Sequence, residues 1–258
     1  MISFFRKTRR WLLQRNKFSK YLLYAVGEVI LIVIGILIAL GINNWNQRKI
    51  IEEREQFYLA GLQEEFRQSR IKLENLIEVN RLNYEGGKKI VDFIDHPEKL
   101  SDEKLLSELL FNSFSYEIDY NPNNSLLNEM INSGSLKDIS NTELRKKLTS
   151  WESIIQSVHR QEANLREQRE IMLDIFRNEE RDIRTILDDT GIAQEFMGLG
   201  SSTDLKSNLE VLESQEFENN LLIYILTGIS TEKSHYEPLL EEIDDMMELI
   251  EKEIEESN

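Results

Sequence analysis

Residues 21–45, YLLYAVGEVILIVIGILIALGINNW, determine how the rest of the chain is organised. The 22 residues from Tyr21 to Ile42 contain one charged residue, Glu28, and no proline. At about 1.5 Å of rise per residue, this stretch forms a helix of roughly 33 Å, which is long enough to cross a bilayer core. We therefore predict a transmembrane helix over residues 21–45.

Charge is distributed unevenly along the chain. The formal net charge is −16, yet residues 1–27 carry seven basic residues and no acidic one. A basic segment before an apolar helix stays in the cytoplasm, so residues 46–258 are predicted to be exported as one domain. That domain is strongly acidic, which excludes nucleic acid as a partner because the phosphates would repel it.

Residues that favour the boundary between water and lipid flank the apolar stretch. The predicted membrane-interface anchors are Trp11, Lys17, Lys20, Tyr21, Trp45 and Arg48. Residues 1–20 place their aromatic side chains on one helical face, which predicts an amphipathic cytoplasmic helix on the inner leaflet. A disordered basic tail is the alternative. The bilayer itself is thus the first predicted partner.

Two features bear on processing and stability. Ala39-Leu40-Gly41 resembles a signal-peptide cleavage site, but the apolar run is about twice as long as a signal peptide needs, so an uncleaved anchor is favoured. The chain has no cysteine, which excludes disulfides and thiolate metal sites. The exported domain must therefore be held together by apolar packing.

Glu28, Gly35 and Ala39 share one stripe of the predicted transmembrane helix, since they follow the spacing i, i+7 and i+11. Two small residues four apart allow close approach of a second helix. We predict a helix contact along this stripe, with a second copy or another membrane protein, in which Glu28 is a polar contact or an ion-sensing group. A carboxylate tolerated near the interface is the alternative.

Apolar residues at 3-4 spacing predict three long helices after Trp45. They cover the continuation of the transmembrane helix to about Asp95, then about 144–186, and about 216–255 with a kink at Pro238. Shorter helices are predicted between them, with Ser101 and Ser140 as N-caps and Gly134 as a C-terminal stop. The predicted fold class is all-α, a transmembrane helix continuing into an elongated antiparallel bundle.

No catalytic, cofactor or metal site is predicted. The three histidines, His96, His159 and His235, lie on separate elements without a ligand-spaced partner, so they are interpreted as surface or packing residues. Glu162 and Arg169 share a helix face, where they are expected to pair or to fix register. The Asn- and Ser-rich residues 121–143 are interpreted as a connector rather than a binding loop.

Two segments resemble a family of uncharacterised membrane proteins of Gram-negative bacteria. They are residues 17–47, KFSKYLLYAVGEVILIVIGILIALGINNWNQ, and residues 132–148, NSGSLKDISNTELRKKL. The resemblance implies a single-pass inner-membrane protein with a periplasmic helical domain, and it implies no activity. We expect a non-enzymatic protein that acts through protein contacts, as a scaffold or accessory subunit. The alternative is a periplasmic sensor that relays a helix shift to a partner.

Overall fold

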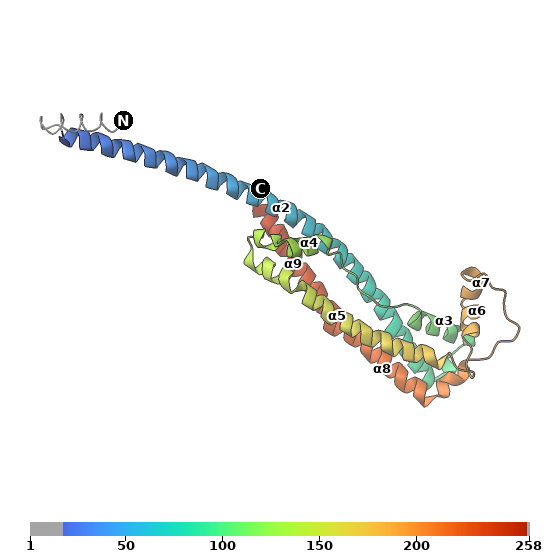
Figure 1. Cartoon of the computed structure of the whole chain (residues 1–258). Coiled ribbons are helices and arrows are strands. Elements are labelled where there is room, and N and C mark those ends of the chain that lie inside the picture. Colours follow the sequence, from blue (N-terminus) through green and yellow to red (C-terminus); the bar gives the residue numbers. More distant parts are fainter. Residues whose placement is uncertain (1–17, 257–258) are drawn as a thin grey trace. The chain divides into compact units, whose positions relative to one another are not determined.

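The computed structural model describes residues 18–256, and over this range the chain is helical and contains no strand (Figure 1). The helices are α2 Phe18–Asp95, α3 Glu103–Phe114, α4 Ser125–Ser133, α5 Thr142–Ile175, α6 Ile183–Asp189, α7 Ile192–Glu195, α8 Gln215–Thr231 and α9 Glu237–Glu256. Short 3-10 turns and one π-helical turn, Glu232–Tyr236, lie between them. The chain divides into two compact units after residue 56, and we call residues 57–258 the helical body.

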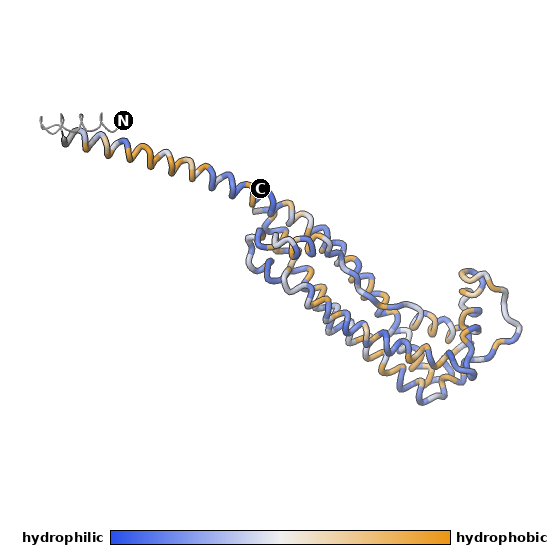
Figure 2. Tube along the Cα trace, in the orientation of Figure 1, coloured by the Kyte–Doolittle hydropathy of each residue, from blue (hydrophilic) through white to orange (hydrophobic). Residues whose placement is uncertain are grey.

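The first unit contains the apolar part of α2. Among the described residues, α2 is the one helix long and apolar enough to cross a membrane, and none of its apolar window is buried. Figure 2 shows this part of α2 as mostly orange, whereas orange and blue alternate along the helices of the body. The predicted single helix from the apolar segment to Asp95 is confirmed.

Within the helical body, one face of α2 lines the apolar core. The predicted 3-4 ladder forms this face, and its buried members are Leu59, Leu62, Phe66, Ser69, Leu73, Asn80, Asn83, Gly87 and Ile90. A Cβ at Gly87 would lie 2.9 Å from Ile225 Cγ1, so glycine allows α8 to approach closely. The helix ends at Asp95 because Pro97 supplies no N–H and restricts the residue before it.

Side-chain contacts show the direction of the long helices of the body. As residue numbers rise along α2 and α5, the numbers of their partners on α8 and α9 fall, as in the pairs Arg70 with Asp244, Arg81 with Glu232, Lys147 with Glu242, and Gln161 with Thr231. Both α2 and α5 are therefore antiparallel to α8 and α9, and parallel to each other. Residues 96–141 carry the chain back along the body between α2 and α5 (Figure 1).

Two helix starts lie one residue later than predicted. Asp102, not Ser101, caps α3, because its carboxylate accepts a hydrogen bond from Leu105 N–H at 2.9 Å. Asn141, not Ser140, caps α5 through hydrogen bonds from the first backbone N–H groups of that helix. The longer Asp and Asn side chains reach these donors from the residue directly before the helix.

The second long helix is shorter than predicted, since α5 ends at Ile175. Asn178 Oδ1 accepts from the N–H groups of Glu180 and Arg181 at 2.9 and 3.1 Å, and Asp182 caps α6. These side chains satisfy backbone donors that a continuing helix would use, so the chain turns. The predicted interruption near Pro238 is confirmed as the π-helical turn that separates α8 from α9.

Candidate functional site

The predicted membrane stripe lies on the exposed part of α2. Glu28, Gly35 and Ala39 are all exposed, and a Cβ built at Gly35 has nothing within 4 Å. The surface at Gly35 is therefore open to close approach by a second helix. Contact along the stripe remains a prediction.

The predicted interface anchors fall partly outside the described residues. Trp11 and Lys17 lie there, and so does the amphipathic segment over residues 1–17. Lys20 lies in the first turn of α2, and Tyr21 and Trp45 are 42% and 62% exposed. Arg48 is exposed and donates from Nε to the Asn44 carbonyl at 3.4 Å. The two aromatic rings are thus available to an interface.

Two buried glutamates in the helical body were not singled out as sites from the sequence, and the first is Glu232 on the π-helical turn. Its carboxylate accepts hydrogen bonds from Arg81 Nε at 3.1 Å and from the Tyr84 O–H at 2.9 Å. Burial raises the pKa of Glu232, but the hydrogen bonds from Arg81 and Tyr84 outweigh it, so the pKa lies below its usual value. The group is ionised and ties α2 to the turn.

Glu162 on α5 is the second buried glutamate, with 1% of the residue exposed. Its Oε1 accepts hydrogen bonds from Tyr120 N–H at 2.9 Å and from the Tyr236 O–H at 2.6 Å. Its Oε2 has no hydrogen-bond partner in the described part of the chain. Burial raises the pKa of Glu162 above its usual value, although these two hydrogen bonds lower it.

Asp119 and His159 lie beside Glu162. One potential ligand atom from each of the three residues lies within 4.8 Å of the other two. The interpretation of His159 as lacking a ligand-spaced partner is therefore wrong, because Glu162 follows it at i+3 and Asp119 reaches the same place from a different segment. The expected pair of Glu162 and Arg169 does not form. Arg169 donates to the carbonyls of Phe114 and Ser115 rather than to Glu162.

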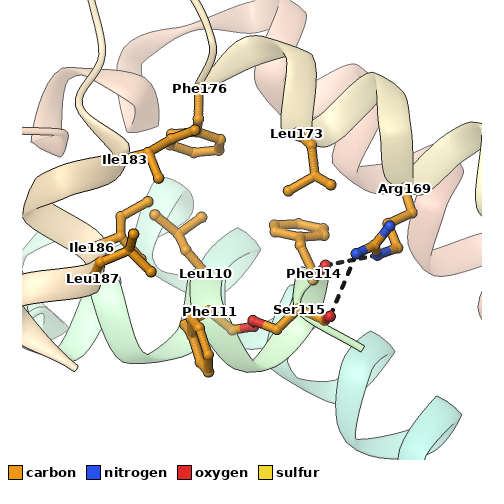
Figure 3. A pocket seen from close by; sticks show the side chains of 10 residues that line it. All are labelled: Leu110, Phe111, Phe114, Ser115, Arg169, Leu173, Phe176, Ile183, Ile186 and Leu187. Atoms are coloured by element: carbon orange, nitrogen blue, oxygen red, sulfur yellow. Dashed lines mark hydrogen bonds between the residues drawn. The ribbon is translucent and has the colours of Figure 1, made fainter. Parts of the chain in front are cut away.

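An apolar cavity of about 270 Å³ lies between α3, α5 and α6 (Figure 3). It is lined by Leu110, Phe111, Phe114, Ser115, Arg169, Leu173, Phe176, Ile183, Ile186 and Leu187. Leu110 and Phe114, Leu173 and Phe176, and Ile183 surround this space, whereas the Phe111 ring points away from it. Residues 177–182 close the turn between α5 and α6, which brings the α6 side chains to this position.

The lining of this cavity is largely apolar. Arg169 is the one charged residue in its lining, and its Nε and one NH2 group donate to backbone carbonyls at 2.7 and 3.4 Å. The lining therefore presents neither a nucleophile with an adjacent base nor a free cation. Such a cavity binds an aliphatic or aromatic group by excluding it from water.

Sequence reasoning missed the cavity because its residues look like ordinary core positions. The 3-4 spacing that marks Leu173 and Phe176 as buried is the same whether the facing side chains fill the space or leave part of it open. The break in the helix after Ile175 is what allows α6 to leave the line of α5 and pack against α3.

In comparisons with known proteins, a family model matches part of this chain. No curated protein and no solved structure matches the chain. The family match covers residues 28–155. This range includes segment 132–148 and overlaps segment 17–47, the two segments that resemble a known membrane family. Residues 28–155, from the apolar part of α2 into the first half of α5, match a family of unknown function, DUF6090.

Proposed function

We propose that the chain is a single-pass inner-membrane protein whose helical body lies in the periplasm as an elongated bundle and acts through protein contacts without catalysis. The observation that carries the proposal is the apolar window of α2, which is fully exposed and continues as one helix into the core-lining face. Exposing that many apolar side chains to water is costly, whereas a bilayer accommodates them.

The absence of cysteine allows a direct test of topology. Single cysteines introduced as Ser3→Cys and Ser150→Cys would be labelled in intact cells with a membrane-impermeant maleimide. Ser150 is exposed on α5, so its replacement leaves the core unchanged. The proposal predicts labelling at position 150 once the outer membrane is permeabilised, and at position 3 only after the inner membrane is opened. The reverse pattern, or a soluble chain, would refute it.

The proposed contact in the membrane is along Glu28, Gly35 and Ala39, with a second copy of the chain or another membrane protein. Gly35→Leu places a large side chain on this stripe, and Gly41→Leu makes the same change about 120° away around the helix. Cross-linking in membranes should lose the complex with Gly35→Leu and keep it with Gly41→Leu. An equal effect of the two changes would count against the stripe.

The apolar cavity favours a second function, that of a ligand sensor. A bound apolar group would contact α3, α5 and α6 together and so alter how these helices pack. Ile183→Trp fills the cavity from a position that is 38% exposed, and Ile223→Trp is a matched change on α8 at 48% exposed. Binding of a fluorescent fatty acid to the full chain in nanodiscs should be lost only in Ile183→Trp. Equal binding by both variants would exclude the cavity as the site.

A further inference from the structure

The backbone of Tyr120 holds two side chains of α5 in one place. Its N–H donates to Glu162 Oε1 at 2.9 Å, and its carbonyl lies 3.0 Å from His159 Nε2. His159 and Glu162 are three residues apart on α5, so they share a helix face. Asp119 directly precedes Tyr120, which brings its carboxylate to the same face.

The buried carboxylate of Glu162 has one oxygen without a partner. Oε1 is satisfied by two donors, but Oε2 has no hydrogen-bond partner among the described residues, and the residue is 1% exposed. Native proteins seldom leave such atoms unsatisfied unless an ion or water completes the site. A cation beside Glu162 supplies the missing interaction.

The ligand set favours a particular ion. A carbonyl only accepts, so Nε2 of a neutral His159 carries the proton and leaves the lone pair on Nδ1, and metal-binding histidines commonly donate their other ring N–H in this way. One imidazole nitrogen with two carboxylate oxygens is a ligand set typical of Zn²⁺, whereas Mg²⁺ and Ca²⁺ prefer oxygen alone. We propose that Asp119, His159 and Glu162 bind a Zn²⁺ ion that joins the segment between α3 and α4 to α5.

The geometry requires only small movements. The three ligand atoms lie within 4.8 Å of one another, and around a tetrahedral Zn²⁺ they would be about 3.4 Å apart. Asp119 and His159 are exposed, so their side chains have room for this adjustment and water can reach the fourth position. Arg166 lies 3.6 Å from Asp119 Oδ1, and it also pairs with Glu117, a partner that it keeps when Asp119 turns toward a metal ion.

Titration of the full-length protein with ZnCl2 after removal of metal by EDTA tests the site. Calorimetry should give one Zn²⁺ per chain, with no comparable binding of MgCl2 or CaCl2. CoCl2 at the same site should give visible absorption bands that respond to loss of a nitrogen ligand. His159→Ala and Asp119→Asn should each weaken Zn²⁺ binding at least about tenfold, and His159→Ala should change the Co²⁺ spectrum.

His96→Ala is the matched control. His96 is also exposed and also lies near two carboxylates, 4.0 Å from Asp92 and 3.9 Å from Glu98, but neither of these is buried. Its replacement should leave Zn²⁺ affinity unchanged. The proposal is overturned if the full-length protein binds no Zn²⁺, or if His159→Ala binds as tightly as His96→Ala.

Discussion

Replacing Glu232 by glutamine removes one buried charge and changes the shape of the side chain very little. In the native chain the carboxylate accepts hydrogen bonds from two nitrogens of Arg81 and from the Tyr84 O–H. A glutamine amide keeps one acceptor oxygen and turns an NH2 group, itself a donor, toward the remaining partner. One donor in the contact between α2 and the π-helical turn therefore loses its acceptor.

The size of the effect follows from the exposure of the two partners. A hydrogen bond to a charged group contributes about 1.5–3 kcal/mol to stability. The Arg81 side chain is 50% exposed, so solvent screens part of its attraction, whereas Tyr84 is 6% exposed. We expect Glu232→Gln to lower the free energy of unfolding by about 2 kcal/mol at pH 7. Glu85→Gln is the control, because the exposed Glu85–Lys88 pair contributes no more than about 0.5 kcal/mol.

The same variant has a defined pH dependence. The pKa of Glu232 is lower in the folded chain than in the unfolded chain, so its contribution is complete above the unfolded pKa of about 4.3 and is lost as the pH falls through the folded pKa. Urea unfolding of the full chain in detergent, followed by circular dichroism, measures the difference between native and variant. The difference should shrink below about pH 4. A difference that stays constant with pH, or that Glu85→Gln reproduces, would refute the reasoning.

Three further changes test the packing and the helix ends by the same unfolding assay. Trp151→Ala should cost about 3–5 kcal/mol, because the ring is 1% exposed and packs edge-on in the core. Asp102→Ala should cost about 1 kcal/mol through loss of the α3 cap, and Ser101→Ala should cost clearly less. Equal costs for the two changes would contradict the assignment of the cap. Gly134→Ala should cost about 1 kcal/mol or more, because the φ of Gly134 is +72°. Gly200 has no positive φ, so Gly200→Ala should be nearly neutral. A neutral Gly134→Ala would contradict the left-handed conformation.

The sequence predicts those parts of the fold that depend on backbone restrictions. Pro97 ends α2 and Gly134 ends α4 because proline lacks an N–H and glycine tolerates positive φ, and both effects are local. The end of α5 was not predictable in the same way. Its 3-4 spacing continues past Ile175, although the competing hydrogen bonds of Asn178 and Asp182 are local, so the sequence holds two opposed signals. The contact of Lys206 N–H with Asp182 Oδ2 at 3.1 Å comes from a distant segment that the spacing does not reveal.

The polar sites are harder to predict because their members come from distant segments. His159 and Glu162 are visible as neighbours on one helix, but Asp119 and Tyr236 meet them only through the packing of two other segments. Among many carboxylates in an acidic chain, none stands out until burial is known. Glu162 and Glu232 become distinctive through their exposure of 1% and 0%, which periodicity does not give.

The pairing of α2 with α8 and α9 limits where the chain can be divided. Arg70 meets Asp244, and the buried amide of Asn80 donates to the Gly228 carbonyl, so these two partners of α2 come late in the chain. Residues 28–155 stop partway along α5 and include none of them. During synthesis α2 therefore lacks these two contacts until α8 and α9 have been made.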